Sequence, residues 1–352
     1  MDDEVSIGAE EYRRTVRAAL CSAGVSASDA HAQTELLLDG DLRGHPSHGV
    51  RRLPVLVERF RNGLIISDAD IRVEWRTDVF ASVDGGWGFG AVVANAAVDA
   101  VVERAGTTGL AMAAVHDANH VGMLAPHVER IARSGQIGIA LTTSEALVHP
   151  WGGSRPLVGT NPIGIAVPTL DEPLVVDMST AAVSMGKVLD HLGKALPLPA
   201  GWAVDADGRP TTDAAAATRG AISPFGGAKG YALGLAFEAL VAVLTGTALG
   251  TDVHGTLDTT QPSTKGDVFL AVSLERLGLQ GALPAVTAYA EQLRASGVDP
   301  ARPVSVPGDR ARRLREHRLV HGIPLHRATW AGIRALAHPT SPDAVPMEVP
   351  RA

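Results

Sequence analysis

Two histidines, a serine and three arginines lie within the fourteen residues from Asp41 to Pro54, directly after an apolar run. If the chain is helical again from Ser47, His48 and Arg52 stand four residues apart on one face, where both side chains can reach one small anion. An imidazole titrates near neutral pH, and a guanidinium presents a fixed fork to a carboxylate. The segment therefore predicts acid–base chemistry on a carboxylate substrate, with a solvated loop that does no chemistry as the alternative.

His120 lies in a second candidate segment, Asp117–Gly122, after a predicted strand and before a predicted helix. Strand ends commonly deliver catalytic groups, because the strand fixes the backbone while the loop exposes the side chain. With Asn119 beside it, His120 could exchange a proton with a substrate. A helix-capping loop with an incidental histidine explains the same residues, and the local sequence leaves both interpretations open.

Hydroxyl and amide groups occupy two further strand ends, in Thr142–Ser144 and Gly159–Pro162. Such groups can bind ribose or phosphate without charge, although the same residues build ordinary turns. Gly226–Gly230 precedes a predicted helix, whose free backbone amides would form an anion site together with the ammonium of Lys229. This segment lacks the spacing of a nucleoside-triphosphate loop.

Two other patterns predict no site. Gly85–Gly90 matches the dinucleotide-binding fingerprint only if Ala91 replaces its third glycine, and no acidic residue follows at the required distance, so we interpret it as a turn. The 13 histidines include His116 and His120 at H-x-x-x-H spacing, but Asp117 stands where a zinc hydrolase needs its glutamate. Because the chain also has only one cysteine, we predict no metal site.

The composition is that of a globular protein. With 352 residues, of which 45% are hydrophobic and 20% charged, the chain is long enough for two domains with sizeable cores. Aromatic residues make up only 4%, so those cores must be aliphatic and rich in alanine. A net charge of -7 gives no broad basic field, which argues against a nucleic-acid partner.

Cysteine content and the first residues favour a cytoplasmic protein. Cys21 lies in a predicted helix from Tyr12 to Ala23, cannot form an internal disulfide, and is interpreted as a buried, inert thiol in a reducing compartment. The N-terminal residues are acidic where a signal peptide would be basic, and no apolar run approaches the ~18 residues of a membrane span. We therefore predict no membrane association.

Apolar periodicity predicts the elements that position these residues. Residues 9–40 form two helices, the second capped by Ser28 or Asp29, and a further helix runs from Val50 to Asn62. From Ile71 onward, strands alternate with alanine-rich helices. The predicted strands are 80–84, 109–116, 137–142, 163–167, 174–177 and 268–273, and the predicted helices are 91–104, 124–134, 231–244, 285–295, 309–321 and 326–337.

The remaining segments suggest how the chain is divided. Residues 193–225 are rich in Pro, Gly, Ala and Asp and are predicted to form a long ordered loop, and 338–352 a loose end. The first 70 residues are predicted to be entirely helical. The simplest arrangement is a helical domain from both chain ends, 1–70 with 275–352, beside an α/β domain at 71–274.

These motifs occur along the chain in the order of a known family. They are Arg43–Gly49 with Arg52 and Pro54, Asn119–Gly122, Gly159–Pro162, Asp177–Thr180, Gly186–Lys187, Gly201–Ala203 with Pro210–Asp213, and Gly227–Tyr231. Over most of its length the sequence resembles the malate/L-lactate dehydrogenase-like family, whose relatives include ureidoglycolate and sulfolactate dehydrogenases, diketogulonate reductase and piperideine/pyrroline-2-carboxylate reductases. The resemblance implies a homodimeric, NAD(P)-dependent oxidoreductase whose nucleotide domain is a largely antiparallel sheet with helices instead of a Rossmann fold.

The resemblance also implies roles for individual residues. Ser47, His48 and Arg52 fall on the catalytic and substrate-binding motif, and His120 on the proton acceptor of some relatives. The nucleotide is assigned to Ser144, Asp177, Met178, Ser179, Lys229 and the amide of Gly230, and the substrate also to Thr160.

The predicted reaction transfers a hydride between the nicotinamide and C2 of a small 2-oxo or 2-hydroxy acid. Arg52 would hold the carboxylate, and His48 is favoured over His120 as the acid because it shares a helical face with Arg52. A cyclic 2-imino acid is the alternative substrate. A non-catalytic nucleotide-binding protein is a remoter alternative, because such a protein would be expected to lose His48 or Arg52.

Two departures from the family and one carboxylate bear on specificity. Leu56 stands where many relatives have a tyrosine, and Ala125–Pro126 where relatives often have Gly-Tyr, which leaves the substrate open. Asp190 could accept hydrogen bonds from the adenosine ribose and repel a 2′-phosphate, which favours NADH over NADPH. A solvated helix carboxylate is the alternative interpretation of Asp190.

Overall fold

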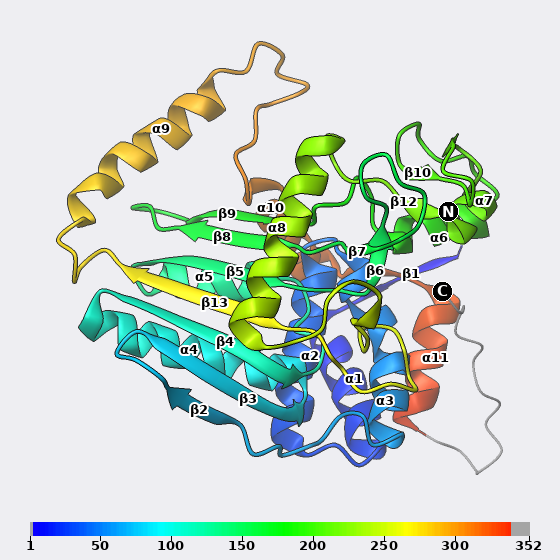
Figure 1. The fold of residues 1–352 in the computed structure, drawn as a ribbon, viewed down its shortest axis with the longest axis horizontal. Coiled ribbons are helices and arrows are strands. Elements are labelled where there is room, and N and C mark those ends of the chain that lie inside the picture. The colour runs from blue at the N-terminus through cyan, green and yellow to red at the C-terminus, as the bar shows by residue number, and fades with distance from the viewer. Residues whose placement is uncertain (1–2, 339–352) are drawn as a thin grey trace.

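The computed structural model describes residues 3–338 and shows a large sheet with helices on both faces, beside a bundle of helices (Figure 1). The sheet has seven strands in the order β2 (Arg72–Trp75), β3 (Phe80–Gly88), β4 (Leu110–Ala118), β13 (Asp267–Ser273), β5 (Gln136–Thr142), β8 (Ile163–Val167) and β9 (Leu174–Met178). Only β3 and β4 are parallel, and every other neighbouring pair is antiparallel. The prediction of a largely antiparallel, non-Rossmann sheet is confirmed.

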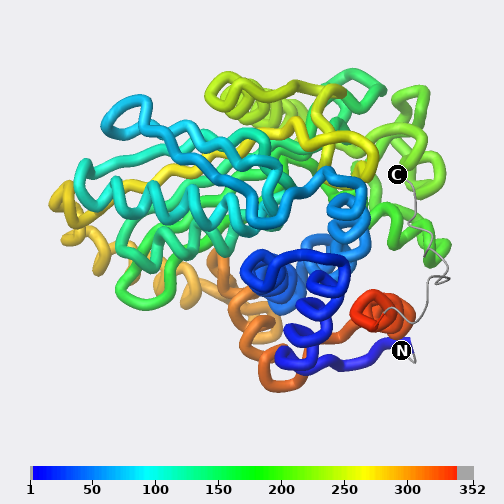
Figure 2. Tube along the Cα trace, turned by 90° about the horizontal axis from the view of Figure 1, so that it is seen from below, coloured from blue at the N-terminus to red at the C-terminus, as the bar shows by residue number. Residues whose placement is uncertain are grey.

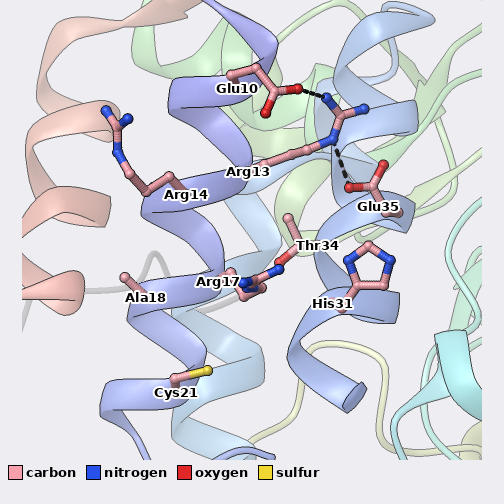
Figure 3. A pocket seen from close by; sticks show the side chains of 9 residues that line it. All are labelled: Glu10, Arg13, Arg14, Arg17, Ala18, Cys21, His31, Thr34 and Glu35. Atoms are coloured by element: carbon pink, nitrogen blue, oxygen red, sulfur yellow. Dashed lines mark hydrogen bonds and ion pairs between the residues drawn. The ribbon is translucent and has the colours of Figure 1, made fainter. Parts of the chain in front are cut away.

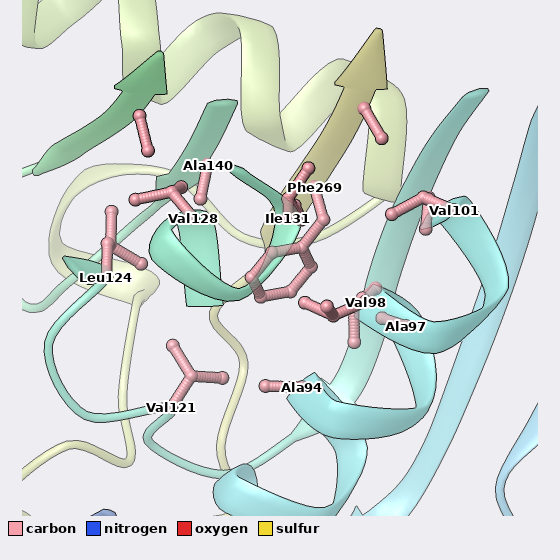
Figure 4. Close-up of a cluster of buried hydrophobic side chains, with 14 of the residues drawn as sticks. Ala94, Ala97, Val98, Val101, Val121, Leu124, Val128, Ile131, Ala140 and Phe269 are labelled. Atoms are coloured by element: carbon pink, nitrogen blue, oxygen red, sulfur yellow. The ribbon is translucent and has the colours of Figure 1, made fainter. Parts of the chain in front are cut away.

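Successive side chains of β13 point to opposite faces of the sheet, and different helices cover the two faces. The helices concerned are α4 (Gly90–Thr108), α5 (Ala125–Arg133) and α8 (Ala228–Thr245). Phe269 points into a core with Val98 of α4 and Ile131 of α5 (Figure 4). The next residue back, Val268, packs with Val241 of α8 on the opposite face. Alanine and valine dominate the first core, as the low aromatic content predicted.

The segment Gly85–Gly90 is mostly strand and not the predicted turn. Gly85 and Gly88 lie in β3, where the register with β4 shifts after Asp84, and Trp87 has a φ of 54°. A β-bulge of this kind re-aims the strand without ending it. The glycine cluster therefore leads directly from β3 into α4.

A second core joins the two ends of the chain. Its helices are α1 (Ala9–Ser22), α2 (Ala27–Leu42), α3 (Leu53–Arg61) and α11 (Arg327–Ala337), and α10 (Asp309–His321) lies against α2. Tyr12 stacks on Trp330 with ring centroids 6.0 Å apart. Ser26 caps α2, accepting a hydrogen bond from the backbone N–H of Asp29, so the predicted cap at Ser28 or Asp29 is wrong.

The N-terminal region is not entirely helical, contrary to the prediction. β1 (Glu4–Ile7) pairs antiparallel with β14 (Ile323–His326), which brings the described ends of the chain side by side (Figure 2). Four-residue strands are too short for their alternation to show in a sequence window. Cys21 is exposed, so its interpretation as a buried thiol is also wrong.

The predicted long loop at 193–225 contains secondary structure. β10 (Ala203–Val204), β11 (Pro210–Thr211), α7 (Ala214–Arg219) and β12 (Ala221–Ile222) lie there, after α6 (Met185–Gly193). The strands join β6 (Ala146–Val148) and β7 (Val158–Gly159) in a second sheet, ordered β11, β10, β12, β6, β7. Two-residue strands between prolines and glycines carry no periodicity, so the composition alone indicated a loop.

Helix α9 (Leu283–Ala295) extends away from the body of the protein (Figure 1). Its Thr287 hydroxyl accepts a hydrogen bond from the backbone N–H of Leu170, near the edge of the large sheet. The predicted loose end at 338–352 lies outside the described residues except for His338. The domain division at residues 70 and 275 stays a prediction.

Helix α8 is long and apolar on average, although Lys229 and Glu238 interrupt its apolar sequence. Its 18 residues have a mean hydropathy of 1.4, so by length and composition it could cross a membrane, although no apolar run of that length was expected. Glu238 on its inner face is buried and accepts hydrogen bonds from the Gly159 backbone N–H (3.0 Å) and Asn161 Nδ2 (2.6 Å). Core helices that pack inside a protein pass the same test of composition.

Candidate active site

His48 and Arg52 lie on two short 3-10 turns and not on one continuous helix. The turns, Pro46–His48 and Val50–Arg52, are separated by Gly49 in an extended conformation, so the predicted shared helical face is wrong. The cause is Asp41 of α2, whose Oδ2 accepts a hydrogen bond from the Val50 backbone N–H at 2.7 Å. A Cβ on Gly49 would lie 2.0 Å from Asp41 Oδ1, so only glycine fits between the turns.

The structure brings His48 and His120 together from distant segments. Their rings stack with centroids 5.5 Å apart and an interplanar angle of 27°. Burial, with the charges of Arg52 and His45, lowers the pKa of His48 to about 3. Burial likewise lowers the pKa of His120 well below its ordinary value, and the charge of Arg52 adds to this effect. Both imidazoles are therefore neutral at pH 7 in the free protein.

Hydrogen bonds distinguish the two histidines. The Gly122 backbone N–H donates to His120 Nδ1 at 3.1 Å, which places the proton of the neutral ring on Nε2. Protonating Nδ1 would break that bond. His48 Nδ1 instead lies 3.1 Å from the Ser47 hydroxyl, which can donate or accept. His48 can therefore gain or lose a proton without losing its partner, whereas His120 is held as a neutral Nε2–H donor.

Arg52 is held by two backbone carbonyls. Its Nε donates to the Ser47 carbonyl (2.9 Å) and its Nη1 to the Thr256 carbonyl (2.6 Å). Burial lowers the pKa of Arg52 to about 10, offset in part by Glu145, so the guanidinium stays charged at neutral pH. Among the described residues Nη2 has no hydrogen-bond acceptor, which leaves the Nη1–Nη2 edge able to bind a carboxylate.

Ser144 and Thr160, both predicted to contact ligands, lie next to each other. Their hydroxyl oxygens are 3.0 Å apart, and Ser144 Oγ also accepts a hydrogen bond from the Thr160 backbone N–H at 2.9 Å. The Thr160 carbonyl accepts hydrogen bonds from the backbone N–H and the hydroxyl of Thr180. The segment after β9 is thereby fixed against this hydroxyl pair.

Lys229 and Gly230 lie in the first turn of α8, as an anion site requires. Gly227, which precedes the helix, has a φ of 66°, a conformation that favours glycine. A Cβ on Gly230 would lie 1.9 Å from the Phe225 carbonyl oxygen. The Lys229 side chain is exposed and forms no ion pair with any described residue. A free ammonium beside helix N-terminal amides fits the phosphates of a dinucleotide.

Asp177, Met178 and Ser179 follow one another at the end of β9 but differ in their surroundings. Asp177 Oδ2 accepts a hydrogen bond from the Ala125 backbone N–H at 2.7 Å, so this carboxylate caps α5. Burial raises the pKa of Asp177 to about 6. Met178 is 43% exposed, and Ser179 Oγ accepts from the Ala181 backbone N–H at 3.3 Å. Met178 is the most exposed of the three, whereas Asp177 and Ser179 are half-buried.

Asp190 lies on α6, whose start adjoins the catalytic segment. A Cβ on Gly186 would be 3.6 Å from Ser47 Cβ. Asp190 itself forms an ion pair with Lys194 one turn later, at 2.8 Å. This pair agrees with the interpretation of Asp190 as a solvated helix carboxylate.

Comparison with known proteins places this geometry in a family. A family model described as malate/L-lactate dehydrogenase matches residues 7–334. The chain belongs to the malate/L-lactate dehydrogenase family. It is 36% identical over 332 residues to malate/(S)-sulfolactate dehydrogenase of Methanothermus fervidus, covering 94% of this chain and 97% of that relative. A Delta(1)-pyrroline-2-carboxylate reductase of Pseudomonas fluorescens is 31% identical over 349 residues, covering 96% and 100%.

A solved structure of a dehydrogenase has the same fold. The dehydrogenase from Sinorhizobium meliloti is 46% identical and superposes with a TM-score of 0.90, covering 95% of this chain and 98% of that chain. The predicted family and the prediction of an oxidoreductase are confirmed. The protein is therefore an enzyme of the dehydrogenase and reductase class.

The sequence analysis gave no role to two buried or half-buried residues, Arg59 and Glu145, and named Asn119 only as the neighbour of His120. Glu145 Oε1 accepts hydrogen bonds from the backbone N–H groups of Thr256 (2.8 Å) and Leu257 (3.0 Å). It thus holds the loop whose carbonyl binds Arg52. An arginine in a predicted helix and a glutamate next to Ser144 are both common in proteins, so the sequence gave no reason to select either residue.

Two other features lie apart from these residues. A surface groove between α1 and α2 has a volume of about 650 Å³. Figure 3 shows that Arg13 bonds there to both Glu10 and Glu35. Asp84, His116 and Asp117 place three potential metal-ligand atoms within 4.8 Å, but His116 Nδ1 already pairs with Asp117 at 2.9 Å.

Proposed function

We propose that the enzyme interconverts a small 2-oxo acid and the corresponding 2-hydroxy acid with NADH or NADPH. The observation that carries the proposal is the pair of stacked, neutral imidazoles beside Arg52, whose Nη2 has no acceptor among the described residues. The nicotinamide, when bound, supplies or accepts the hydride at C2. The M. fervidus relative is named for malate and sulfolactate, which are both 2-hydroxy acids.

Each active-site residue has one task in this proposal. The Nη1–Nη2 edge of Arg52 binds the substrate carboxylate, and Ser47 positions His48. His120 donates the Nε2 hydrogen bond that polarises the carbonyl oxygen. His48, once protonated, gives its proton to the oxygen as C2 gains the hydride, so the product is a neutral hydroxyl group.

A cyclic 2-imino acid is the second candidate substrate, in which the proton goes to nitrogen instead of oxygen. The P. fluorescens relative, named a pyrroline-2-carboxylate reductase, favours it. Leu56, the residue that replaces a tyrosine of many relatives, is 5% exposed and packs in the helical core. A side chain buried there offers no hydrogen bond to either substrate.

An absorbance assay of NAD(P)H consumption with a panel of substrates tests the proposal. The panel contains lactate-, malate- and sulfolactate-type 2-oxo acids and the five- and six-membered cyclic imino acids. We expect the highest kcat/KM with a 2-oxo acid. Highest activity with a cyclic imino acid would replace the first candidate by the second, and inactivity of the folded enzyme on every compound would contradict both.

Lys229 is proposed to bind the cofactor pyrophosphate with the amides at the start of α8. Lys229→Ala is expected to raise the Kd of NAD(P)H about tenfold, since a charge-assisted hydrogen bond contributes about 1.5–3 kcal/mol. Nucleotide fluorescence titration measures this Kd. Arg76→Ala is the control, because Arg76 is also exposed but pairs with Glu74. An unchanged Kd in Lys229→Ala would contradict the role.

NADH is proposed as the preferred cofactor because of the negative charge of the Asp190 carboxylate. Asp190→Ala is expected to narrow the difference in KM between NADH and NADPH, because a carboxylate near the ribose repels a 2′-phosphate. The same ratio in wild type and variant would show that Asp190 serves only its pair with Lys194.

A homodimer is proposed to form through the outer face of α8. Leu233, Leu240 and Val243 on that face are exposed, the last by 82%, and contiguous apolar surface of this kind usually meets a partner. Leu240→Asp with Val243→Asp is expected to convert a dimer into a monomer in sedimentation velocity. Val320→Asp, at another exposed valine, should leave the dimer intact. A monomeric wild-type protein would contradict the proposal.

A further inference from the structure

Arg59 of α3 is a buried arginine without a carboxylate partner. It is 1% exposed, and no described Asp or Glu lies within ion-pair distance. Burying a charge is costly unless its donors are satisfied. Nη1 and Nη2 of the guanidinium instead donate to three neutral oxygens, Asn119 Oδ1 (2.9 Å) and the carbonyls of Gln261 (3.1 Å) and Asp258, while the buried Nε has no partner among the described residues. Arg59 therefore joins α3 to two loops far away in the sequence.

The first of these loops carries His120. Asn119, which precedes it, is 1% exposed, and its Nδ2 donates to the carbonyls of Trp87 (2.7 Å) and Gly88 (3.0 Å). With its Oδ1 taken by Arg59, the amide has a partner on both sides and cannot flip. On the far side of the segment, a Cβ on Gly90 would lie 2.1 Å from the His120 carbonyl oxygen. The backbone of His120 is thus fixed between Arg59 and the start of α4.

The second loop holds Arg52. Thr256 supplies the carbonyl that binds Arg52 Nη1, and two residues later Asp258 supplies a carbonyl to Arg59. Arg59 consequently contacts the segments that position both His120 and Arg52, while itself lying outside the reacting groups.

We propose that Arg59 is a positioning residue for the catalytic reaction: through Asn119 and the 256–261 loop it sets the place of His120 relative to the carboxylate-binding arginine. The proposal rests on the proposed function for its kinetic consequences. Its positive charge also contributes to the lowered pKa of His120, although burial, Arg52, His48 and Lys265 have larger effects. Arg59 therefore supports both the position and the neutral state of that imidazole.

Kinetics of Arg59→Gln and Arg59→Lys form the first test, with Arg61→Gln, an exposed arginine on the same helix, as the control. We expect both Arg59 variants to lose about 10- to 100-fold in kcat, because small displacements of a positioned group have effects of that size. The KM of NAD(P)H and the activity of Arg61→Gln should be unchanged. Near-wild-type kcat in Arg59→Gln, or equal losses in kcat and cofactor binding, would overturn the proposal.

A double-mutant cycle tests whether Arg59 acts through Asn119. If it does, Asn119→Ala lowers kcat similarly, and the double variant is no slower than the slower single variant. Additive losses would show that the two residues act independently. Lysine at position 59 keeps the charge in a folded core, so this variant remains informative if the glutamine variant does not fold.

A spectroscopic readout separates this inference from the choice of substrate. In the wild type, NMR of the histidine side-chain nitrogens should show His120 as the Nε2–H tautomer, with its signals identified by their absence in His120→Gln. In Arg59→Lys the Gly122 bond to Nδ1 is misaligned, and we expect a mixture of tautomers. An unchanged tautomer in Arg59→Lys would refute the positioning role even if no substrate is turned over, and a wrong substrate assignment would leave the expected tautomer change intact.

Discussion

Replacement of His48 by alanine is expected to lower kcat for 2-oxo acid reduction by about 10²- to 10⁴-fold, the usual contribution of a positioned general acid. His48 can accept a proton because its Nδ1 faces a hydroxyl that serves as donor or acceptor. His120 lacks this freedom, since Gly122 donates to its Nδ1. His120→Ala should also slow the reaction, by about 10²- to 10³-fold, through loss of one donor to the carbonyl oxygen.

The pH dependence of kcat distinguishes the two histidines better than the size of the loss. Burial and the charge of Arg52 lower the pKa of His48 to about 3 in the free protein. A carboxylate bound to Arg52 offsets that charge, so substrate binding raises the pKa of His48. Reduction, which needs protonated His48, declines as pH rises through that pKa, and oxidation of the hydroxy acid declines as pH falls through it.

Stopped-flow and steady-state rates across pH provide the measurement. In His120→Ala, the rate of reduction should still decline as pH rises, as in the wild type. In His48→Ala this pH dependence should disappear, while the Kd for NAD(P)H stays unchanged. The roles assigned to the two histidines would have to be exchanged if His48→Ala turned over near the wild-type rate, or if only His120→Ala lost the pH dependence of reduction.

Arg52→Ala is expected to lower kcat/KM by roughly 30-fold or more, mainly through KM, because losing one partner of a buried charged pair costs about 2–5 kcal/mol. Arg52→Lys should recover little, since a lysine has no planar fork and cannot bind the Ser47 and Thr256 carbonyls and a carboxylate together. Arg51→Ala, at the exposed neighbouring arginine, is the matched control.

Removing the charge of Arg52 has a second, measurable consequence. The pKa of His48 is held down by burial and by this guanidinium, so it should rise in Arg52→Ala. Histidine NMR in the free variant, or a shifted pH profile, reports that change. An unaltered substrate KM in Arg52→Ala would remove the arginine from carboxylate binding whatever happens to His48.

The sequence by itself singled out the candidate reactive side chains and predicted the bounds of several elements. His48, Arg52 and His120 were recognisable because titration and charge belong to the residue type. The sequence predicted β8 at 163–167 and α10 at 309–321 with their observed bounds, and Gly308 and Gly322 stand at the two ends of α10. The antiparallel sheet was implied by the resemblance to the family, whose motifs occur here in the same order. The predicted alternation of strands and helices would not by itself have indicated it.

Only the tertiary structure decided how those side chains work together. The stacking of His48 on His120 depends on segments that the fold brings side by side. Asp41 breaks the expected helix between His48 and Arg52, and it does so from another helix. The partners that hold Arg52 are backbone carbonyls, which every residue possesses, so no sequence pattern could have pointed to Thr256. Chemistry could be predicted from side-chain type, whereas geometry depended on which main-chain atoms the fold places nearby.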